Sequence, residues 1–310
     1  MKNGVFKILS LFLRTIISIV ENLKDINFHP IRTYEAENTN LRTTRLTGRA
    51  NSCIIPPYMA AQTIVFANQK GGVGKTTSAV NIGAFLAEAG KKVLLLDFDP
   101  QGNLSSSVGA EREQPGSYEL ITEQSNFRQV AQETTVRNMM VIPADINLTG
   151  ANIELIEAEE REHYLKKAIA KFKNDWDYIL IDSPPSLGML TLNGLVAADY
   201  IFIPLQCEYF AMEGLSQLLK TIRMVQRSLN PDLKIGGIFF TMYDSRTNLA
   251  NEVVQEVTAY FKEVVFKTII PRNVRLSEAP SHRVPISQYN ATCIGAKSYQ
   301  KLAEEVINRV

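Results

Sequence analysis

The sequence is poor in cysteine and contains no cysteine pair at metal-binding spacing. Its 3 cysteines, Cys53, Cys207 and Cys293, lie far apart, and none stands in a CxxC arrangement. This pattern argues against a disulfide framework, a zinc site or a cysteine-ligated cluster. Isolated thiols are typical of a reducing compartment, and we therefore expect a cytoplasmic protein.

The sequence also lacks an excess of charge of either sign. It has 33 lysine and arginine residues against 32 aspartate and glutamate residues, for a formal net charge of +1. The whole molecule is therefore not a polycation, and any nucleic-acid binding must come from a local basic patch. The hydrophobic content of 45% is typical of a globular protein with a core.

No apolar run is both long enough and sufficiently free of charged residues to indicate a membrane span. Residues 5–20 are mostly apolar, but Lys7 and Arg14 interrupt them, and a span needs about 20 mostly apolar residues. A signal-peptide core and an amphipathic surface helix are further interpretations of this stretch. The polar stretch that follows offers little to build a core. We interpret residues 1–58 as a poorly ordered extension, which could be translated from upstream of a true start at Met59.

From Met59 onward, short apolar runs alternate with segments of helical spacing. Strands are predicted at residues 63–68, 92–97, 139–143, 178–182, 200–205, 234–241 and 264–270. Helices are predicted at residues 77–89, 160–173, 212–229, 249–261 and 296–310. This alternation predicts a single α/β domain over residues 59–310, with a mostly parallel twisted sheet and helices on both faces. Ligands in such folds bind at the carboxyl ends of the strands.

A glycine-rich loop lies between the first predicted strand and the first predicted helix, as a phosphate-binding P-loop requires. It reads Lys70, Gly71, Gly72, Val73, Gly74, Lys75, Thr76 and Thr77. The glycines let backbone N–H groups face one concavity that suits phosphate oxygens, and the helix adds the positive end of its dipole. Lys75 can reach the β- and γ-phosphates, the Thr76 hydroxyl can ligate Mg²⁺, and Thr77 is placed for the α-phosphate.

Three aspartates stand at the ends of predicted strands. Asp97 and Asp99 are two residues apart, so their side chains can face the same site. Asp182 ends a buried strand and is followed by two prolines, Pro184 and Pro185, which stiffen the next loop. A buried strand that ends in aspartate beside a P-loop indicates a Walker B residue, which binds Mg²⁺ through water.

The loop departs from the standard P-loop in a way that resembles the deviant Walker A motif of the ParA/Soj and MinD superfamily. Its first position holds Gln69 instead of glycine, and Lys70 is a second lysine within the loop. The resemblance implies that Lys70 reaches across a nucleotide-sandwich dimer to the ATP of the partner. A second cation near the γ-phosphate would offset charge that moves in the transition state.

The resemblance extends over nearly all of residues 61–310 and is closest to ParA/Soj-type chromosome-partitioning ATPases. It is carried by residues 68–77, 97–103, 182–187, 208–214, 241–247 and 270–281. It implies that Asp99 orients the attacking water, that Asp97 lies near the water shell of the metal, and that ATP and Mg²⁺ are the cofactors. An ordinary carboxylate is a weak base, so Asp99 is interpreted as a positioning group of a slow ATPase.

The family resemblance also implies contacts outside the phosphate site. Pro271 and Asn273 are the candidates near the adenine, and Arg246 and Arg275 match the positions that grip DNA without reading its sequence. The implied function is an ATP-dependent homodimer with ATP sandwiched between its subunits. It binds nonspecific DNA of the nucleoid and hydrolyses ATP when a ParB/Spo0J-type centromere-binding protein stimulates it, in chromosome or plasmid segregation.

Two other functions fit parts of the sequence. A membrane-associated positioning ATPase like MinD needs a C-terminal amphipathic membrane helix, whereas residues 302–310 contain acidic residues and no aromatic anchor, which favours a helix packed on the core. The apolar stretch at residues 5–20 keeps this alternative open. An electron-transfer ATPase like the nitrogenase iron protein needs cluster ligands that Cys207 and Cys293 do not supply.

Overall fold

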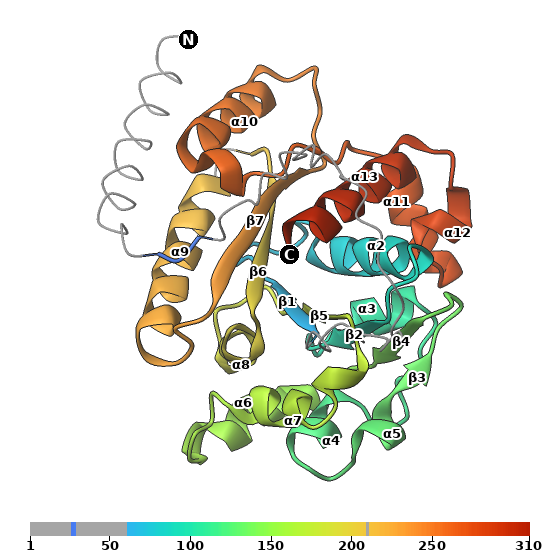
Figure 1. Cartoon of the computed structure of the whole chain (residues 1–310), viewed down its shortest axis with the longest axis vertical. Coiled ribbons are helices and arrows are strands. Elements are labelled where there is room, and N and C mark those ends of the chain that lie inside the picture. Colours follow the sequence, from blue (N-terminus) through green and yellow to red (C-terminus); the bar gives the residue numbers. More distant parts are fainter. Residues whose placement is uncertain (1–25, 29–60, 209–210) are drawn as a thin grey trace, which may run out of the picture.

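The computed structural model describes residues 26–28, 61–208 and 211–310 (Figure 1). The apolar stretch at residues 5–20 and the predicted domain boundary at Met59 lie outside these ranges, and the division of the chain there stays a prediction. Within the described part, no helix combines the length and the apolarity that crossing a bilayer demands.

The centre of the molecule is a seven-stranded sheet with the order β3-β4-β2-β5-β1-β6-β7. The strands are β1 (Gln62–Phe66), β2 (Val93–Asp97), β3 (Gln132–Glu133), β4 (Met139–Ile142), β5 (Tyr178–Asp182), β6 (Tyr200–Gln206) and β7 (Lys234–Thr241). Only the two-residue edge strand β3 pairs antiparallel with its neighbour, and the other described pairs are parallel. The prediction of a mostly parallel sheet is confirmed.

Helices cover both faces of this sheet (Figure 1). They are α2 (Lys75–Glu88), α3 (Asn103–Ser107), α4 (Ser117–Ile121), α5 (Phe127–Val130), α6 (Leu148–Glu154), α7 (Tyr164–Ala170), α8 (Met189–Ala197), α9 (Ala211–Ser228), α10 (Asn248–Phe261), α11 (Val274–Glu278), α12 (Ile286–Asn290) and α13 (Ile294–Arg309). Helices α2 and α13 pack on one face, whereas α7, α8 and α9 pack on the other.

Alternate residues of each central strand supply the two halves of the core. In β1, Val65 belongs to the cluster under α8 and α9, whereas Ile64 and Phe66 belong to the cluster under α2 and α13. This follows from the two-residue side-chain period of a strand. Because both faces are covered, the central strands are apolar throughout, which explains why they were recognisable in the sequence.

The predicted strand at residues 264–270 is wrong. Val265 makes only an isolated bridge to Ile238. The N–H of Phe266 donates to the carbonyl of Ile238 on β7 at 2.8 Å. The N–H groups of Lys267 and Thr268 donate instead to the carboxylate of Glu305 on α13, at 2.9 and 2.8 Å. The N–H of Ile270 donates again to β7, to the carbonyl of Phe240 at 2.9 Å. The segment therefore runs along β7 but forms no regular strand, because the carboxylate of Glu305 takes two of its N–H groups in between.

The predicted helix at residues 160–173 is shorter in the structure. It begins at Tyr164, as α7 (Tyr164–Ala170). Glu160 has a φ of 50°, which is outside the right-handed helical region and excludes the predicted start at that residue.

Candidate nucleotide-binding site

The carboxyl ends of β1, β2 and β5 meet at one edge of the sheet. Strand β5 lies between the other two, and its last residue Asp182 stands beside Phe66 of β1 and Asp97 of β2. Two carboxylates from different parts of the sequence are thus brought together by strand register. The glycine-rich loop leaves β1 at the same edge, which makes this the ligand-binding end of the sheet.

The loop between β1 and α2 has the backbone shape of a phosphate cradle. Gly74, the residue before α2, has φ 88° and ψ 25°, a left-handed conformation that favours glycine. Lys75 is the first helical residue and is only 6% exposed. Its Nζ donates to the backbone oxygens of Asn68 and Lys70, at 3.2 and 3.4 Å, so the ammonium group lies inside the loop.

The position of Lys75 also affects its proton affinity. Burial lowers the pKa of the Lys75 ammonium group, and the nearby carboxylates of Asp182 and Asp99 oppose this effect. A triphosphate in the loop would add negative charge beside the ammonium group and favour its charged form.

Asp182 is fully buried and only half satisfied. Its Oδ2 accepts a hydrogen bond of 2.6 Å from the Thr76 hydroxyl, whereas its Oδ1 has no partner among the described residues. Burial raises the pKa of this carboxyl well above its usual range, and Asp97 contributes to the rise. An unpaired buried carboxylate oxygen beside a threonine hydroxyl fits the chemistry of a Mg²⁺ water shell.

Asp97 is buried too, but it has partners. The backbone N–H and the hydroxyl of Ser105 donate to its Oδ2, at 2.8 and 2.6 Å, and the N–H of Asp99 donates to its Oδ1 at 3.2 Å. Burial raises the pKa of Asp97 to about 6, although the Ser105 hydrogen bonds oppose this. The structure therefore brings Asp97 and Asp99 to the predicted edge and fixes Asp97 through the first turn of α3.

The donor set suits magnesium better than a metal held by protein alone. No group of three or more His, Cys, Asp and Glu side chains within the described ranges is arranged to hold a metal ion. Mg²⁺ usually keeps several waters and binds through one or two carboxylates together with substrate phosphates. Thr76, Asp97 and Asp182 can hold it in that way, with the phosphates supplying the remaining charge.

Lys70 is held differently from Lys75, although both lie in the same loop. Its Nζ forms an ion pair with Oε2 of Glu208, just beyond β6, and lies 3.5 Å from Oε1 of Gln206. The side chains of Lys70 and Glu208 are 35% and 49% exposed. Lys70 is therefore at the rim of the cradle, where a second molecule can reach it.

The predicted adenine contacts lie next to the loop. Tyr243, which follows β7, pairs with Pro271. The N–H of Arg272 donates to the carbonyl of Tyr243 at 3.0 Å. The strand end before it is tied to the loop, because the Thr241 hydroxyl donates to the carbonyl of Val73 at 2.8 Å. This brings Pro271 to the side of the cradle, with Asn273 two residues beyond it.

The predicted DNA contacts are exposed and ion-paired. The guanidinium of Arg246 lies 2.6 Å from Oδ2 of Asp244, and that of Arg275 lies 2.7 Å from Oε2 of Glu278. The two arginine side chains are 86% and 53% exposed. They follow the two residues that pair with each other, Tyr243 and Pro271, by three and four positions.

Comparison with known proteins gives a consistent family. A family model described as AAA domain matches residues 61–235. The chromosome-partitioning ATPase Soj of Treponema pallidum is 61% identical over 248 residues, which cover 80% of this chain and 98% of that protein. The sporulation initiation inhibitor protein Soj of Bacillus subtilis is 54% identical over 78% of this chain and 97% of its own length. The chain belongs to the ParA/Soj family of chromosome-partitioning ATPases.

Solved structures agree with this family and with its cofactors. A Mycobacterium smegmatis protein described as cobyrinic acid a,c-diamide synthase, solved with an ATP analogue and magnesium, is 39% identical. It matches 80% of this chain and 94% of its own with a TM-score of 0.69. The predicted cofactors, ATP and Mg²⁺, and the predicted ATPase activity are confirmed for this ParA/Soj family member.

Sequence reasoning missed the residues that support the ParA/Soj site from behind. Asn68 donates to the carbonyl of Pro204 at 2.8 Å, and its own Oδ1 accepts from the N–H of Lys70 at 3.0 Å. Ser105 holds Asp97, and Glu208 holds Lys70. Glu208 and Asn68 lie in segments that resemble the family, which was the available signal; nothing in the sequence marks Ser105.

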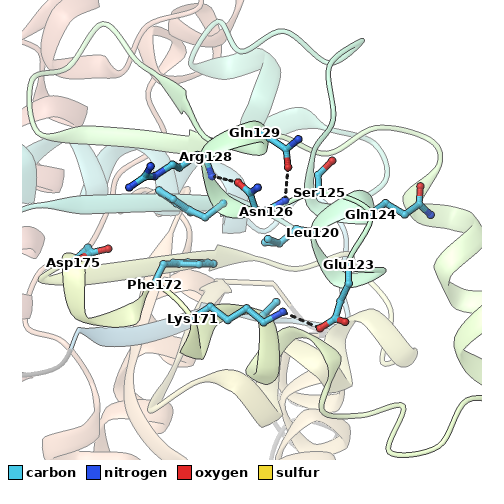
Figure 2. Close-up of a pocket in the computed structure, with 12 residues that line it drawn as sticks. Leu120, Glu123, Gln124, Ser125, Asn126, Arg128, Gln129, Lys171, Phe172 and Asp175 are labelled. Carbon is cyan, nitrogen blue, oxygen red and sulfur yellow. Dashed lines mark hydrogen bonds and ion pairs between the residues drawn. The ribbon is translucent and has the colours of Figure 1, made fainter.

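A cavity with a volume of about 640 Å³ lies elsewhere, between α4, α5 and α7 (Figure 2). Its sides include Phe172 and Leu120, and an ion pair between Lys171 and Glu123 stands at one side. It contains none of the predicted phosphate, metal or adenine residues. The cavity is therefore separate from the nucleotide site.

Proposed function

We propose that this ATPase is a switch that dimerises with ATP, binds DNA nonspecifically and releases it after hydrolysis stimulated by a ParB-type partner. Its role would be chromosome or plasmid segregation, with the protein on the nucleoid. One observation carries the proposal: the loop has two lysines in different settings. Lys75 is buried in its own cradle, whereas Lys70 stands at the exposed rim.

The setting of Lys70 supports a sandwich dimer. A lysine needed only for its own phosphates would lie inside the cradle as Lys75 does, with backbone partners. The partner of Lys70 is instead an exposed carboxylate, and an exposed ion pair is worth only about 0–1 kcal/mol. The γ-phosphate of a second subunit can therefore compete for Lys70, which would make dimerisation depend on ATP.

Hydrolysis would use the buried end of the site. Asp99 is only 6% exposed and lies beside Asp97 at the end of β2, where it can orient the attacking water. Lys75 would stabilise charge on the transferred phosphoryl group, with Lys70 of the other subunit opposite it. Bound Mg²⁺ would neutralise phosphate charge. Loss of the γ-phosphate would then remove the attraction for Lys70 and allow the dimer to open.

DNA binding would use the exposed arginines next to the adenine side. Arg246 and Arg275 lie on segments that pair with each other and that are tied to the loop through Thr241. Each arginine forms an ion pair at the surface, with Asp244 or with Glu278. DNA phosphates can replace these carboxylates at little cost in free energy. The nucleotide state could thus affect the arginines through the hydrogen bond of the Thr241 hydroxyl to Val73 and the pairing of Tyr243 with Pro271.

The test is to compare DNA binding of the purified protein with ATP, with ADP and without nucleotide, at several salt concentrations. We expect binding with ATP only, with log affinity falling linearly with log salt. Arg246→Ala and Arg275→Ala should each weaken binding and reduce the salt slope by about 1. Arg128→Ala, an exposed arginine on α5, is the matched control. Binding that ignores the nucleotide, or that survives both arginine changes unaltered, contradicts the proposal.

The alternative of a MinD-like membrane ATPase gains no support from the C-terminal helix. The apolar side of α13 is buried against α2, with Tyr299, Leu302 and Val306 in the core. A membrane-binding helix needs that side for lipid. Residues 5–20, which kept this alternative open, lie outside the described residues.

A further inference from the structure

Strand β7 (Lys234–Thr241) ends the sheet on one side, with β6 as its only strand neighbour in the seven-stranded order. It has eight residues, whereas the strand at the opposite edge, β3, has two. Residues 265–270 cover the carboxyl half of this edge, where the N–H groups of Phe266 and Ile270 donate to the carbonyls of Ile238 and Phe240, at 2.8 and 2.9 Å. An uncovered edge presents unpaired N–H and C=O groups and invites pairing with another chain. Such an edge is usually shortened, charged or covered.

The beginning of this edge is covered by residues from the N-terminal segment. Phe28 forms a parallel bridge with Ile235, and the N–H of Ile235 donates to the carbonyl of Asn27 at 3.0 Å. Figure 1 shows this short blue segment running past α9 toward β7. The contact joins residues about 200 positions apart and extends the sheet in the parallel direction.

Side chains hold the same segment from two further elements. The Asn27 amide donates to the carbonyl of Pro231, in the turn before β7, at 3.0 Å. The Gln226 amide, on α9, donates to the carbonyl of Asn27 at 3.4 Å and to that of Leu233 at 2.8 Å. Asn27 is therefore bonded through its side chain and its backbone.

The flanking side chains are apolar and partly or fully removed from water. Ile26 is 5% exposed and belongs to the same core cluster as Ile235 and Val225, and Phe28 packs against that cluster. Burying an isoleucine of this kind contributes about 1.5–3 kcal/mol. An apolar–polar–apolar triplet in extended conformation is the pattern of an edge strand.

We infer that the outer edge of β7 around Ile235 is a docking surface for an extended peptide, and that residues 26–28 of the same chain occupy it. The N-terminal segment is then clipped to the ATPase domain by one stretch of parallel pairing and one buried isoleucine. The surface lies at the amino end of β7, whereas the nucleotide loop contacts Thr241 at its carboxyl end. The inference is therefore independent of the proposed function.

The first experiment uses Ile26→Asp in the 310-residue chain. A buried carboxylate without a partner is costly, so the segment should leave the edge. We expect the melting temperature to fall by about 5 °C and the amide of Ile235 to exchange with deuterium at least about tenfold faster. Ile146→Asp is the matched control, because Ile146 is 70% exposed, and it should change neither quantity. Equal behaviour of the two variants would overturn the inference.

A second experiment covers the case in which Ile26→Asp folds poorly. Ile26→Ala combined with Phe28→Ala removes the apolar contacts of the segment without adding a charge, and deuterium exchange is followed at the amide of Ile235. We expect this amide to exchange at least about threefold faster than in the wild-type chain. An unchanged exchange rate at Ile235 overturns the inference. Magnesium–ATP binding measured by calorimetry should stay the same throughout.

Discussion

The phosphate loop and the paired segments at residues 241–247 and 270–278 lie at the same end of the sheet, but different interactions hold them. At the phosphate loop, Lys75 and the neighbouring Asp182 of β5 are buried and are bonded to backbone or to a threonine hydroxyl. In the paired segments, Arg246 and Arg275 are exposed and are bonded to nearby carboxylates. Buried groups are fixed by strand register, whereas exposed ion pairs exchange easily.

This difference separates the part that binds nucleotide from the parts that respond to it. A buried charge without its partner is expensive, so the loop has one stable arrangement that nucleotide completes. An exposed ion pair contributes little, so a phosphate from ATP or DNA can replace the carboxylate. Lys70 lies in the loop by sequence, but its contact is an exposed ion pair like those of Arg246 and Arg275. Four substitutions test this division.

The largest effect is expected from Lys75→Ala. It removes the ammonium group that lies inside the loop, and with it the stabilisation of the transferred phosphoryl group. We expect the ATPase rate at saturating Mg²⁺–ATP to fall by at least about 100-fold. Lys166→Ala, an exposed lysine on α7, is the matched control. A variant that keeps its turnover would show that the cradle is not the catalytic site.

Asp182→Asn should affect stability and metal use in opposite directions. The pKa of Asp182 in the folded protein is raised above its value of about 3.9 in the unfolded chain. The nucleotide-free protein therefore loses stability as the pH rises from the unfolded pKa to the folded pKa. The amide carries no charge, and the variant without nucleotide should therefore melt a few degrees higher at pH 8, with less gain at pH 5.

The same variant should need at least about tenfold more Mg²⁺ for ATP hydrolysis, because the carboxylate is lost. Thermal melts at the two pH values and a magnesium titration measure both effects. A lower melting temperature at pH 8 would mean that the Asp182 carboxylate stabilises the nucleotide-free site. It would contradict the claim that this buried charge is costly until nucleotide binds.

Glu208→Gln should strengthen ATP-dependent dimerisation. It removes the carboxylate that holds Lys70 within its own subunit. An exposed ion pair of about 0.2–1 kcal/mol corresponds to a gain in dimer affinity of up to about fivefold for each of the two subunits, measurable by analytical ultracentrifugation with ATP. Glu213→Gln, an exposed position on α9, controls for the loss of charge. If Glu208→Gln weakens the dimer, Glu208 acts across the interface and does not compete with it.

The smallest effect is expected from Asp244→Asn. Arg246 donates to both carboxylate oxygens of Asp244, at 2.8 and 2.6 Å. Without this pairing, Arg246 should contact DNA more readily, with affinity rising by about twofold in a binding titration with ATP. Asp175→Asn, an exposed residue near α7, corrects for the change in net charge. An unchanged affinity relative to this control would place DNA away from Arg246.

Much of the nucleotide site could be predicted because its signals are local. The strands Tyr178–Asp182 and Lys234–Thr241 have the predicted bounds, since fully buried parallel strands are continuous apolar runs with clear ends. The P-loop needs a fixed order of residues, so Lys75 and Thr76 could be identified from spacing. The proximity of Asp97 and Asp182 followed from the carboxyl ends of the strands.

The remaining features depend on contacts between distant parts of the chain. The ion pair of Lys70 with Glu208 joins residues that are 138 positions apart, and no local sequence pattern predicts it. The segment at residues 264–270 has the composition of a strand, but Glu305 takes two of its N–H groups, those of Lys267 and Thr268. The edge contact of Asn27 with Ile235 was missed for the same reason, because a short polar-flanked triplet carries little periodic signal.

The close packing behind β7 has a consequence for the evolution of the family. A methyl group on Gly237 would lie 2.1 Å from the ring of Phe266, which packs against Phe239 with ring centroids 6.0 Å apart. A side chain at position 237 therefore does not fit while position 266 holds phenylalanine. A survey of related sequences should find a side chain at position 237 only together with a smaller residue than phenylalanine at position 266, as a covarying pair.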